Sequence, residues 1–339
     1  MKSVLSIDWL SYFGEFSPAL VLSPLKLRMC EYGTKVFHSR ADVLCGERIV
    51  GTIAFAPRSS ILDDKLAVFK FENSVLYEAD FCDLRKQILH CLCLKVKGIN
   101  RLDLALDFNY LQNGMNGHVF IKQFLSAKYL HNGRGKFSVQ GSQKFENDFE
   151  YLRLGSKTSP VTAYLYNKSK EMQDVKLKPY IVERWKQAGL NTDVSVWRLE
   201  FSMSSDFFSM VDKDSGAFPL SIDCDFSDLE ELKILYQSLI NRYFEFRINN
   251  HTQNKSRMPK VDLVVLSDVF GNYSRIQANR QSGRRERIFL HYLHKYAERI
   301  GFNSLNAGFE LEYVKAEFIK KTGLESYYLK KRDAWDMAE

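Results

Sequence analysis

Three stretches of the chain alternate between apolar and polar residues, which predicts strands that have one buried face and one polar face. They are RLDLALDF at 101–108, VTAYLYNK at 161–168 and WRLEFSM at 197–203. The outer faces of half-buried strands usually carry a mixture of threonine, lysine and serine. Here they carry carboxylates, arginines and tyrosines instead. If the three strands share one sheet, these polar side chains converge on one surface.

The polar faces carry the carboxylates of Asp103, Asp107 and Glu200, which would repel one another if they were close. Such clusters persist by protonation, by pairing with arginine or lysine, or by holding a cation. Asp103 and Asp107 are four residues apart on a strand, so ~13 Å separates their Cα atoms and they are not expected to bind one ion together. We expect one of them to pair with an arginine or to support a helix, and the other to bind Mg²⁺ or Mn²⁺ with Glu200. The alternative is a salt-bridged surface that includes Arg101 and Arg198.

The strand at 161–168 adds two tyrosines and a lysine to the same face. A phenol with a pKa of ~10 is a poor nucleophile until a metal, a lysine or a base assists it. Beside a cation, either Tyr164 or Tyr166 is placed for phosphoryl transesterification, with Lys168 to neutralise the phosphate. The chain has 17 tyrosines and 25 phenylalanines, so a packing role is the alternative for either tyrosine.

The rest of the pattern predicts an α+β protein with a central antiparallel sheet and helices packed on one side of it. Further strands are expected at 6–12, 34–38, 41–45, 48–56, 66–71, 137–140 and 149–154. Apolar residues at helical spacing predict helices over 80–96, 119–130, 179–188, 229–246, 284–300 and 310–322. The character becomes helical after residue 205. We therefore expect a catalytic domain over 1–205 and a helical, basic accessory region over 206–339.

Positive charge is concentrated in the second of these parts. The formal net charge is +7 and the pI is near 8.9, which favours polyanionic partners. Residues 240–300 alone hold 12 basic and 5 acidic residues, an excess of +7. The densest run contains Arg275, Arg280, Arg284, Arg285 and Arg287. We expect this run to contact DNA phosphates; a solvated helix entry is the alternative.

Composition limits the class of protein. A hydrophobic share of 45% and a charged share of 26% are ordinary for a soluble globular chain. No stretch approaches the ~18 apolar residues of a membrane span, and the N-terminus has no signal-peptide pattern. The six cysteines form no C-x-x-C pair, and Cys91 and Cys93 lie in an apolar run, which favours free buried thiols in a reducing compartment. We expect a cytoplasmic protein.

Three motifs, taken in order and spacing, resemble those of the Rep_trans family of rolling-circle replication initiators. They are R-x-D-x-x-x-D at 101–107, L-Y-N-K-S-K-E at 165–171 and W-R-L-E-F at 197–201. The family includes Gram-positive plasmid Rep proteins, relaxases of integrative elements and replication proteins of filamentous vibriophages. The opening IDWLSY at 7–12 looks most like the filamentous-phage branch, and the resemblance covers roughly residues 5 to 205. The chain lacks the His-hydrophobe-His pair of the HUH nickases, and His291 and His294 are expected to be a surface pair.

The resemblance implies roles for the candidate residues. Tyr166 would nick one strand of the replication origin and keep a 5′-phosphotyrosyl link. The acidic metal site would consist of Glu200 with Asp103 or Asp107 and would hold Mg²⁺ or Mn²⁺. The residues implied as partners of phosphate, carboxylate or DNA are Lys168, Arg198, Arg101 and Tyr164. The resemblance also implies a homodimer that recruits a host helicase to origin DNA in a bacterial cell, with a phage or a plasmid as the replicon.

The function we favour is therefore a replication initiator with DNA nicking and closing activity. One alternative is a DNA-binding regulator that kept the fold without the chemistry, so that it would bind an origin without forming a covalent product. Another is a mobilisation relaxase, in which the same chemistry serves conjugation. A third is an unrelated metal-dependent phosphoesterase, whose hydrolysis would survive loss of Tyr166 but not loss of Glu200.

Overall fold

A computed structural model of the chain describes residues 2–133, 136–142, 148–156, 158–210, 229–252, 254–264 and 266. The chain divides into two compact units, Met1–Ala278 and Asn279–Glu339, and all described residues belong to the first. The arginine run at 275–287, the pair His291 and His294, and the helices expected over 284–300 and 310–322 lie outside the described residues. Their expected roles stay predictions.

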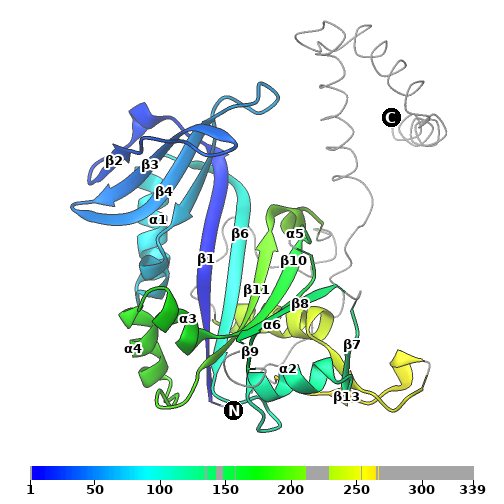
Figure 1. The fold of residues 1–339 in the computed structure, drawn as a ribbon. Helices are drawn as coiled ribbons and strands as arrows, with labels where there is room; N and C mark the ends of the chain where they lie inside the picture. Colours follow the sequence, from blue (N-terminus) through cyan, green and yellow to red (C-terminus); the bar gives the residue numbers. More distant parts are fainter. Residues whose placement is uncertain are drawn as a thin grey trace, which may run out of the picture. The chain divides into compact units, whose positions relative to one another are not determined.

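Ten strands form one antiparallel sheet within the described part of the chain (Figure 1). In order across the sheet they are β2 (Leu25–Met29), β3 (Phe37–Cys45), β4 (Arg48–Pro57), β5 (Leu66–Phe71), β1 (Ser3–Glu15), β6 (Lys95–Phe108), β11 (Trp197–Ser204), β10 (Val161–Asn167), β9 (Asp148–Leu154) and β8 (Phe137–Ser142). The long strands β1 and β6 pair along almost their whole length at the centre. A second, three-stranded sheet joins β7 (Tyr129–His131), β12 (Phe246–Ile248) and β13 (Lys260–Val261).

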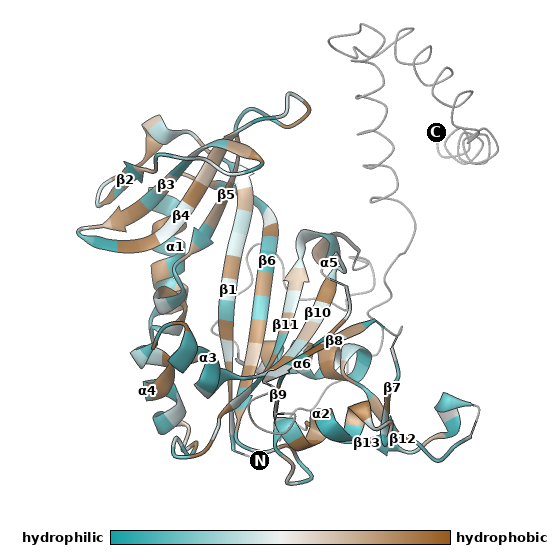
Figure 2. Ribbon diagram, in the orientation of Figure 1, coloured by the Kyte–Doolittle hydropathy of each residue, from teal (hydrophilic) through white to brown (hydrophobic). Residues whose placement is uncertain are grey.

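The three strands predicted to share a polar face are neighbours in the large sheet, in the order β6, β11, β10. Directly paired residues of antiparallel strands point to the same face of a sheet. The register aligns Asp107 with Arg198 and Tyr166, Ala105 with Glu200 and Tyr164, and Asp103 with Ser202 and Thr162. The prediction that the polar faces converge is confirmed, and the α+β fold with its central antiparallel sheet is confirmed with it. The alternation of hydrophilic and hydrophobic residues along β1 and β6 is visible in Figure 2.

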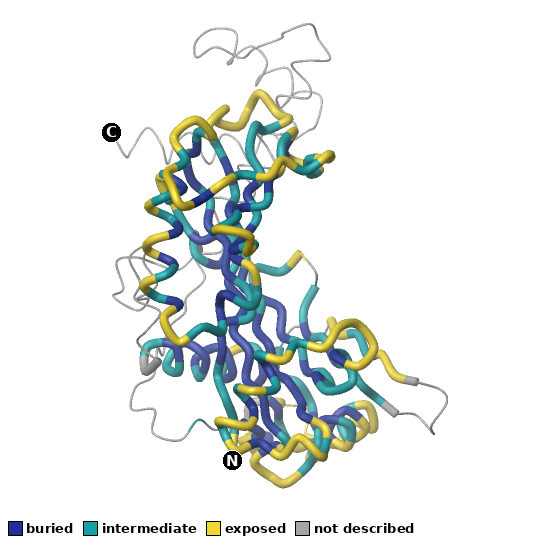
Figure 3. Tube along the Cα trace, turned by 90° about the vertical axis from the view of Figure 1, so that its left-hand side faces the viewer, coloured by how far each residue is buried: buried dark blue, intermediate teal, exposed yellow. Residues whose placement is uncertain are grey.

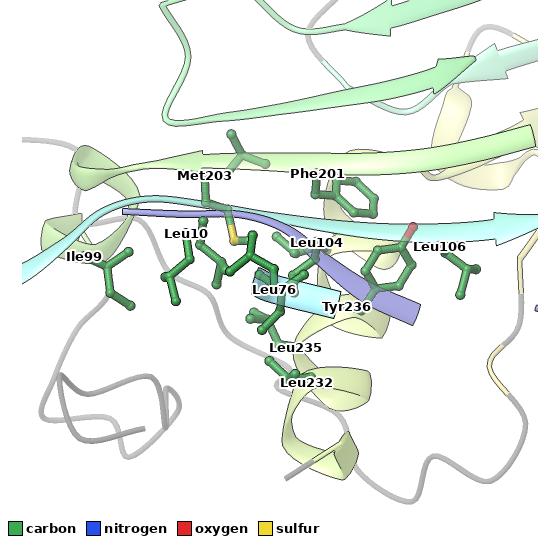
Figure 4. Close-up of a cluster of buried hydrophobic side chains, with 14 of the residues drawn as sticks. Leu10, Leu76, Ile99, Leu104, Leu106, Phe201, Met203, Leu232, Leu235 and Tyr236 are labelled. Carbon is green, nitrogen blue, oxygen red and sulfur yellow. The ribbon is translucent and has the colours of Figure 1, made fainter. Parts of the chain in front are cut away.

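The opposite face of the sheet is apolar and carries α6 (Leu229–Tyr243). Figure 4 shows Leu235 and Tyr236 of this helix beside Leu104 and Phe201 of the sheet, in one buried cluster. The hydroxyl of Tyr236 donates to the backbone oxygen of Leu199 at 2.6 Å. Because its apolar stripe covers the centre of the sheet, α6 belongs to the same compact unit as the sheet. The first compact unit therefore continues past the expected boundary at residue 205 and ends at Ala278.

Helix α1 (Phe81–Cys91) extends the same core toward β5. Phe81 and Ile88 are buried, and the Phe81 ring meets the Phe71 ring edge to face, with centroids 5.6 Å apart. The central strands are buried along most of their length, as the dark segments of Figure 3 show.

Two further helices, α3 (Lys168–Asp174) and α4 (Pro179–Gln187), cover one end of the polar face. They contribute Met172, Ile181 and Trp185 to a separate apolar cluster, against which Val4 of β1 packs. Val4 pairs with Asp107, so its side chain lies on the polar face. Helices therefore lie on both faces of the sheet, and the expectation of helices on one side is wrong. The remaining described elements are α2 (Gly117–Leu125), α5 (Ser205–Met210), and the 3₁₀ turns η1 (Pro18–Leu20), η2 (Asn73–Tyr77) and η4 (Lys255–Arg257).

Several predicted element boundaries differ from the structure, and two of the differences have a clear local cause. The helix expected over 80–96 ends at Cys91, because Cys93 adopts a left-handed φ of +50° and its N–H donates back to the His90 carbonyl at 2.9 Å. The strand expected over 161–168 ends at Asn167, whose side chain accepts a hydrogen bond from the Lys170 N–H and caps α3. Lys168 is therefore the first residue of a helix and not the last residue of the strand.

None of the five described cysteines takes part in a disulfide bond. They are half-buried and not fully buried, Cys91 and Cys93 included. No helix in the described segments combines the length and the hydrophobicity that a membrane crossing requires.

Candidate active site

A hydrogen bond between Tyr166 and Glu200 lies on the polar face of the sheet. The two residues stand on neighbouring strands and are diagonal to each other, because Glu200 pairs directly with Tyr164, two residues before Tyr166. The Tyr166 hydroxyl donates to Oε2 of Glu200 at 2.8 Å. Glu200 is 9% exposed and Tyr166 is half-buried. The pair is therefore largely shielded from water, while the tyrosine keeps an exposed part.

Electrostatics set the protonation of this pair. Burial raises the pKa of Glu200, and the nearby carboxylates of Asp103 and Asp8 raise it further, from 4.5 to about 7. Burial and the Glu200 charge hold the pKa of Tyr166 well above its ordinary value of 10. At neutral pH the phenol is protonated and Glu200 is close to its midpoint. A carboxylate poised near the working pH beside a hydroxyl is the arrangement of a general base and its nucleophile.

Arg198 lies two residues before Glu200 on the same face of β11 and is fully buried. Its Nε and Nη2 donate to the two carboxylate oxygens of Asp107, at 2.6 and 2.7 Å. Nη1 donates to Asp8 at 2.6 Å. Because its exposed fraction is 0%, the guanidinium is a carboxylate partner and not a group that reaches a DNA phosphate. The carboxylates hold the pKa of Arg198 well above its ordinary value despite its burial.

Asp107 is enclosed by these contacts. Besides both bonds from Arg198, it accepts a hydrogen bond from the indole N–H of Trp185 in α4, at 2.7 Å. Asp107 therefore takes the first of the two roles expected for the acidic strand, that of an arginine partner beneath a helix. Asp103 remains as the candidate to act with Glu200.

Asp8 belongs to this site although the alternation of the three motifs gave no sign of it. The register between β1 and β6 shifts between Ile7 and Trp9, so Asp8 is the extra residue of a β-bulge. The bulge brings its carboxylate to Arg198 and to the Tyr77 hydroxyl, which donates to Asp8 at 2.7 Å. Burial alone would raise the pKa of Asp8, but Arg198 and Lys168 hold it below its ordinary range. The consecutive apolar residues Trp9 and Leu10 break the alternation of β1, and this break is the sequence signal that indicates such a bulge.

Asp103 lies on the other side of Glu200 and is paired with Arg101. Arg101 donates to both oxygens of Asp103, at 2.9 and 2.5 Å, and its own side chain is 38% exposed. Burial raises the pKa of Asp103 in spite of this partner. The described part of the chain holds no group of three or more His, Cys, Asp or Glu side chains arranged to hold a metal. A pair of carboxylates still fits Mg²⁺, which commonly takes one or two carboxylates and completes its shell with water and phosphate oxygens.

Lys168 remains part of the site although it begins a helix. Its Nζ lies 5.5 Å from the centroid of the Tyr166 ring and 2.7 Å from a carboxylate oxygen of Glu171. Burial, and repulsion by Arg198, lower its pKa from the ordinary value of 10.5. A buried ammonium at this position favours negative charge on the neighbouring phenol oxygen.

The described residues that were predicted for the site thus fall into two groups. Those brought into contact with the Tyr166–Glu200 pair or its immediate surroundings are Asp103, Arg101, Lys168 and Arg198. Tyr164 is half-buried on the same face, and Asp107 supports Arg198. The residues that sequence reasoning missed are Asp8, Tyr77 and Trp185, and all three come from elements outside the three motifs.

No protein-family model matches the chain, and no curated protein matches it. Among solved structures, a rolling circle replication initiator protein from Geobacillus stearothermophilus aligns with it. The alignment covers 76% of this chain and 92% of that chain, with 13% sequence identity and a TM-score of 0.47. At so distant a likeness, the chemistry of the site rests on its own side chains.

Proposed function

We propose that this chain nicks and rejoins one strand of DNA through a tyrosyl intermediate on Tyr166, and that it thereby initiates rolling-circle replication. The observation that carries the proposal is the 2.8 Å hydrogen bond from Tyr166 to Glu200, a carboxylate with a pKa of about 7. The resemblance of the three motifs to those of replication initiators supports DNA as the substrate.

In the nicking step the Tyr166 oxygen attacks the scissile phosphorus. A P–O bond forms to the tyrosine, and the bond to the 3′-oxygen of the DNA breaks. The phenol proton passes to Glu200, which then returns it to the departing 3′-oxygen, so the strand ends in a hydroxyl. Rejoining is the reverse: the 3′-hydroxyl gives its proton to Glu200, attacks the phosphotyrosyl group and releases the phenol. One phosphodiester replaces another, so the step needs no energy source.

The other residues act on this pair. Lys168 stabilises negative charge as it develops on the Tyr166 oxygen. Arg198 ties β11 to Asp107 and Asp8, and through Asp107 to α4, so that Glu200 is held on a rigid strand. Asp103 would hold Mg²⁺ or Mn²⁺ together with Oε1 of Glu200, the carboxylate oxygen that does not accept the Tyr166 hydrogen bond. When bound, such an ion neutralises phosphate charge and makes the phosphorus easier to attack.

The test is the chemical identity of the adduct. Purified protein is incubated with Mn²⁺ and supercoiled DNA of the parent replicon, the DNA is trimmed with nuclease, and the protein is digested for mass spectrometry. We expect a nucleotide on the peptide that contains Tyr166. Nicked DNA with no nucleotide on any tyrosine would instead favour a hydrolytic phosphoesterase.

A further inference from the structure

Trp9 lies on the polar face of β1, on the same surface as the Tyr166–Glu200 pair. It pairs with Asp103 of β6, and three strand spacings, roughly 14 Å, separate β1 from β10, which carries Tyr166. The indole is half-buried, and its N–H donates to Oγ of Ser11 at 3.3 Å, which fixes the ring relative to the sheet.

Two cations lie over the Trp9 ring. Nζ of Lys70, from β5, is 3.6 Å from the ring centroid, and Cζ of Arg101, from β6, is 4.4 Å from it. The side chains of Lys70 and Arg101 come from the two strands that flank β1. An indole fixed between an ammonium and a guanidinium thus forms a flat aromatic and basic surface, and Arg101 links it to the Asp103 carboxylate of the active site.

We propose that Trp9 is a stacking platform for a base of single-stranded DNA that lies across the polar face. When the base binds, the Lys70 ammonium leaves the ring face for an adjoining phosphate, and Arg101 stays on the ring beside the next phosphate. This inference rests on the proposed function. Every base has a π-face and every nucleotide a phosphate, so an aromatic ring flanked by cations binds single strands with little regard to sequence. Bases in a duplex are stacked on one another and are not available to Trp9. The platform therefore distinguishes the unpaired strand that reaches the tyrosine from the duplex around it.

Tryptophan fluorescence reads this contact directly. Of the four tryptophans, Trp185 and Trp197 are only 3% and 2% exposed, and Trp335 lies outside the described residues. The full-length protein with Tyr166→Phe and Trp335→Phe is titrated with a short oligothymidylate, so that no covalent product forms and Trp9 is the accessible reporter. We expect quenching of the fluorescence on binding and none of this quenching once Trp9→Phe is added.

Affinity gives a second readout. Trp9→Ala should weaken single-strand binding about 5- to 100-fold, Trp9→Phe should recover most of it, and duplex binding should not change. Lys70→Met should lower the slope of log affinity against log salt by about 0.7. Tyr32→Ala is the matched control, because Tyr32 is an aromatic residue 72% exposed between β2 and β3. Thermal melts confirm that each variant is folded, and the quenching titration itself is made on protein that keeps Trp9.

The two claims fail separately. If wild-type protein forms the tyrosyl adduct but oligothymidylate leaves Trp9 fluorescence and the Trp9→Ala affinity unchanged, the stacking platform is wrong and the proposed function stands. If oligothymidylate quenches Trp9 but no adduct forms with any divalent metal, the nicking function is wrong and the platform stands as a single-strand binding site.

Discussion

Glu200 lies directly opposite Tyr164 in the register of β10 and β11, yet its carboxylate accepts the hydroxyl of Tyr166, at 2.8 Å. Alternation places both tyrosines on the same face, so the sequence pattern alone leaves them equivalent. The diagonal hydrogen bond removes that equivalence, because it gives the Tyr166 proton an acceptor that titrates near neutral pH. Tyr166 is for this reason the tyrosine we expect to react.

The raised pKa of Glu200 has a consequence for stability. The folded protein keeps the Glu200 proton up to about pH 7, whereas the unfolded chain releases it near the ordinary value of 4.5. The folded state binds more protons between these values, so this contribution to stability is present at pH 4 and is lost as the pH rises to about 7. Glu200→Gln should therefore raise the free energy of unfolding at pH 8 by on the order of 3 kcal/mol, and should change it little at pH 4. Urea denaturation at both pH values measures this, and an equal effect at both would contradict the raised pKa.

Arg198 should matter more to folding than to DNA affinity. Arg198→Met leaves Asp107 and Asp8 without their main partner, and breaking a buried pair typically costs about 3–5 kcal/mol. Arg198→Lys should recover only part of the loss, because an ammonium cannot make the fork to Asp107. The control is Arg28→Met, which removes an exposed arginine from Asp42 and should change the free energy of unfolding by less than about 1 kcal/mol. A DNA affinity that falls while the stability of Arg198→Met stays normal would point to a phosphate contact instead.

Substitutions of Asp103 and Asp107, the two aspartates of β6, should have different effects in a metal titration. Asp103→Asn should raise the Mn²⁺ concentration needed for half-maximal nicking, because it removes one of the two carboxylates proposed to bind the ion. Asp107→Asn should mainly lower the melting temperature, because it removes the charge that neutralises buried Arg198. Nicking is measured across a Mn²⁺ series, alongside melting curves. The reverse pattern would move the metal site to Asp107.

Helix α6 should be essential to the stability of the sheet. Leu235 is buried against the central strands, so Leu235→Ala should cost about 2–5 kcal/mol of unfolding free energy. Arg242→Ala, at an exposed position of the same helix, should stay within about 0.5 kcal/mol of wild type. Denaturant melts of both variants test this. If Leu235→Ala is as stable as Arg242→Ala, α6 is not part of the core.

The central part of the fold was predictable because its signal is local. Strict alternation in β6, β10 and β11 fixes which side chains share a face, and the register then places Glu200 beside both tyrosines. Side-chain hydrogen bonds between strands are harder to predict from the sequence. The choice of Tyr166 over Tyr164 depends on side-chain conformation, which alternation does not encode.

The errors have equally specific causes. Cys93 ends α1 in a left-handed conformation that glycine usually supplies, so the apolar spacing suggested a longer helix. Asp8 enters the site through a bulge, a one-residue irregularity that long-range pairing stabilises. The domain boundary at residue 205 followed a change from strand to helix pattern, but α6 packs on the sheet and continues its core. Tertiary packing decided each of these features.

The most direct test of the account is a covalent-capture assay with paired tyrosine variants. Wild type, Tyr166→Phe and Tyr164→Phe are incubated with Mn²⁺ and supercoiled DNA of the parent replicon, and the products are separated on denaturing gels. We predict nicked DNA with a protein-linked band for wild type and Tyr164→Phe, and neither product for Tyr166→Phe. A protein-linked band that persists in Tyr166→Phe, or wild-type protein that binds the DNA and never nicks it, would contradict the account.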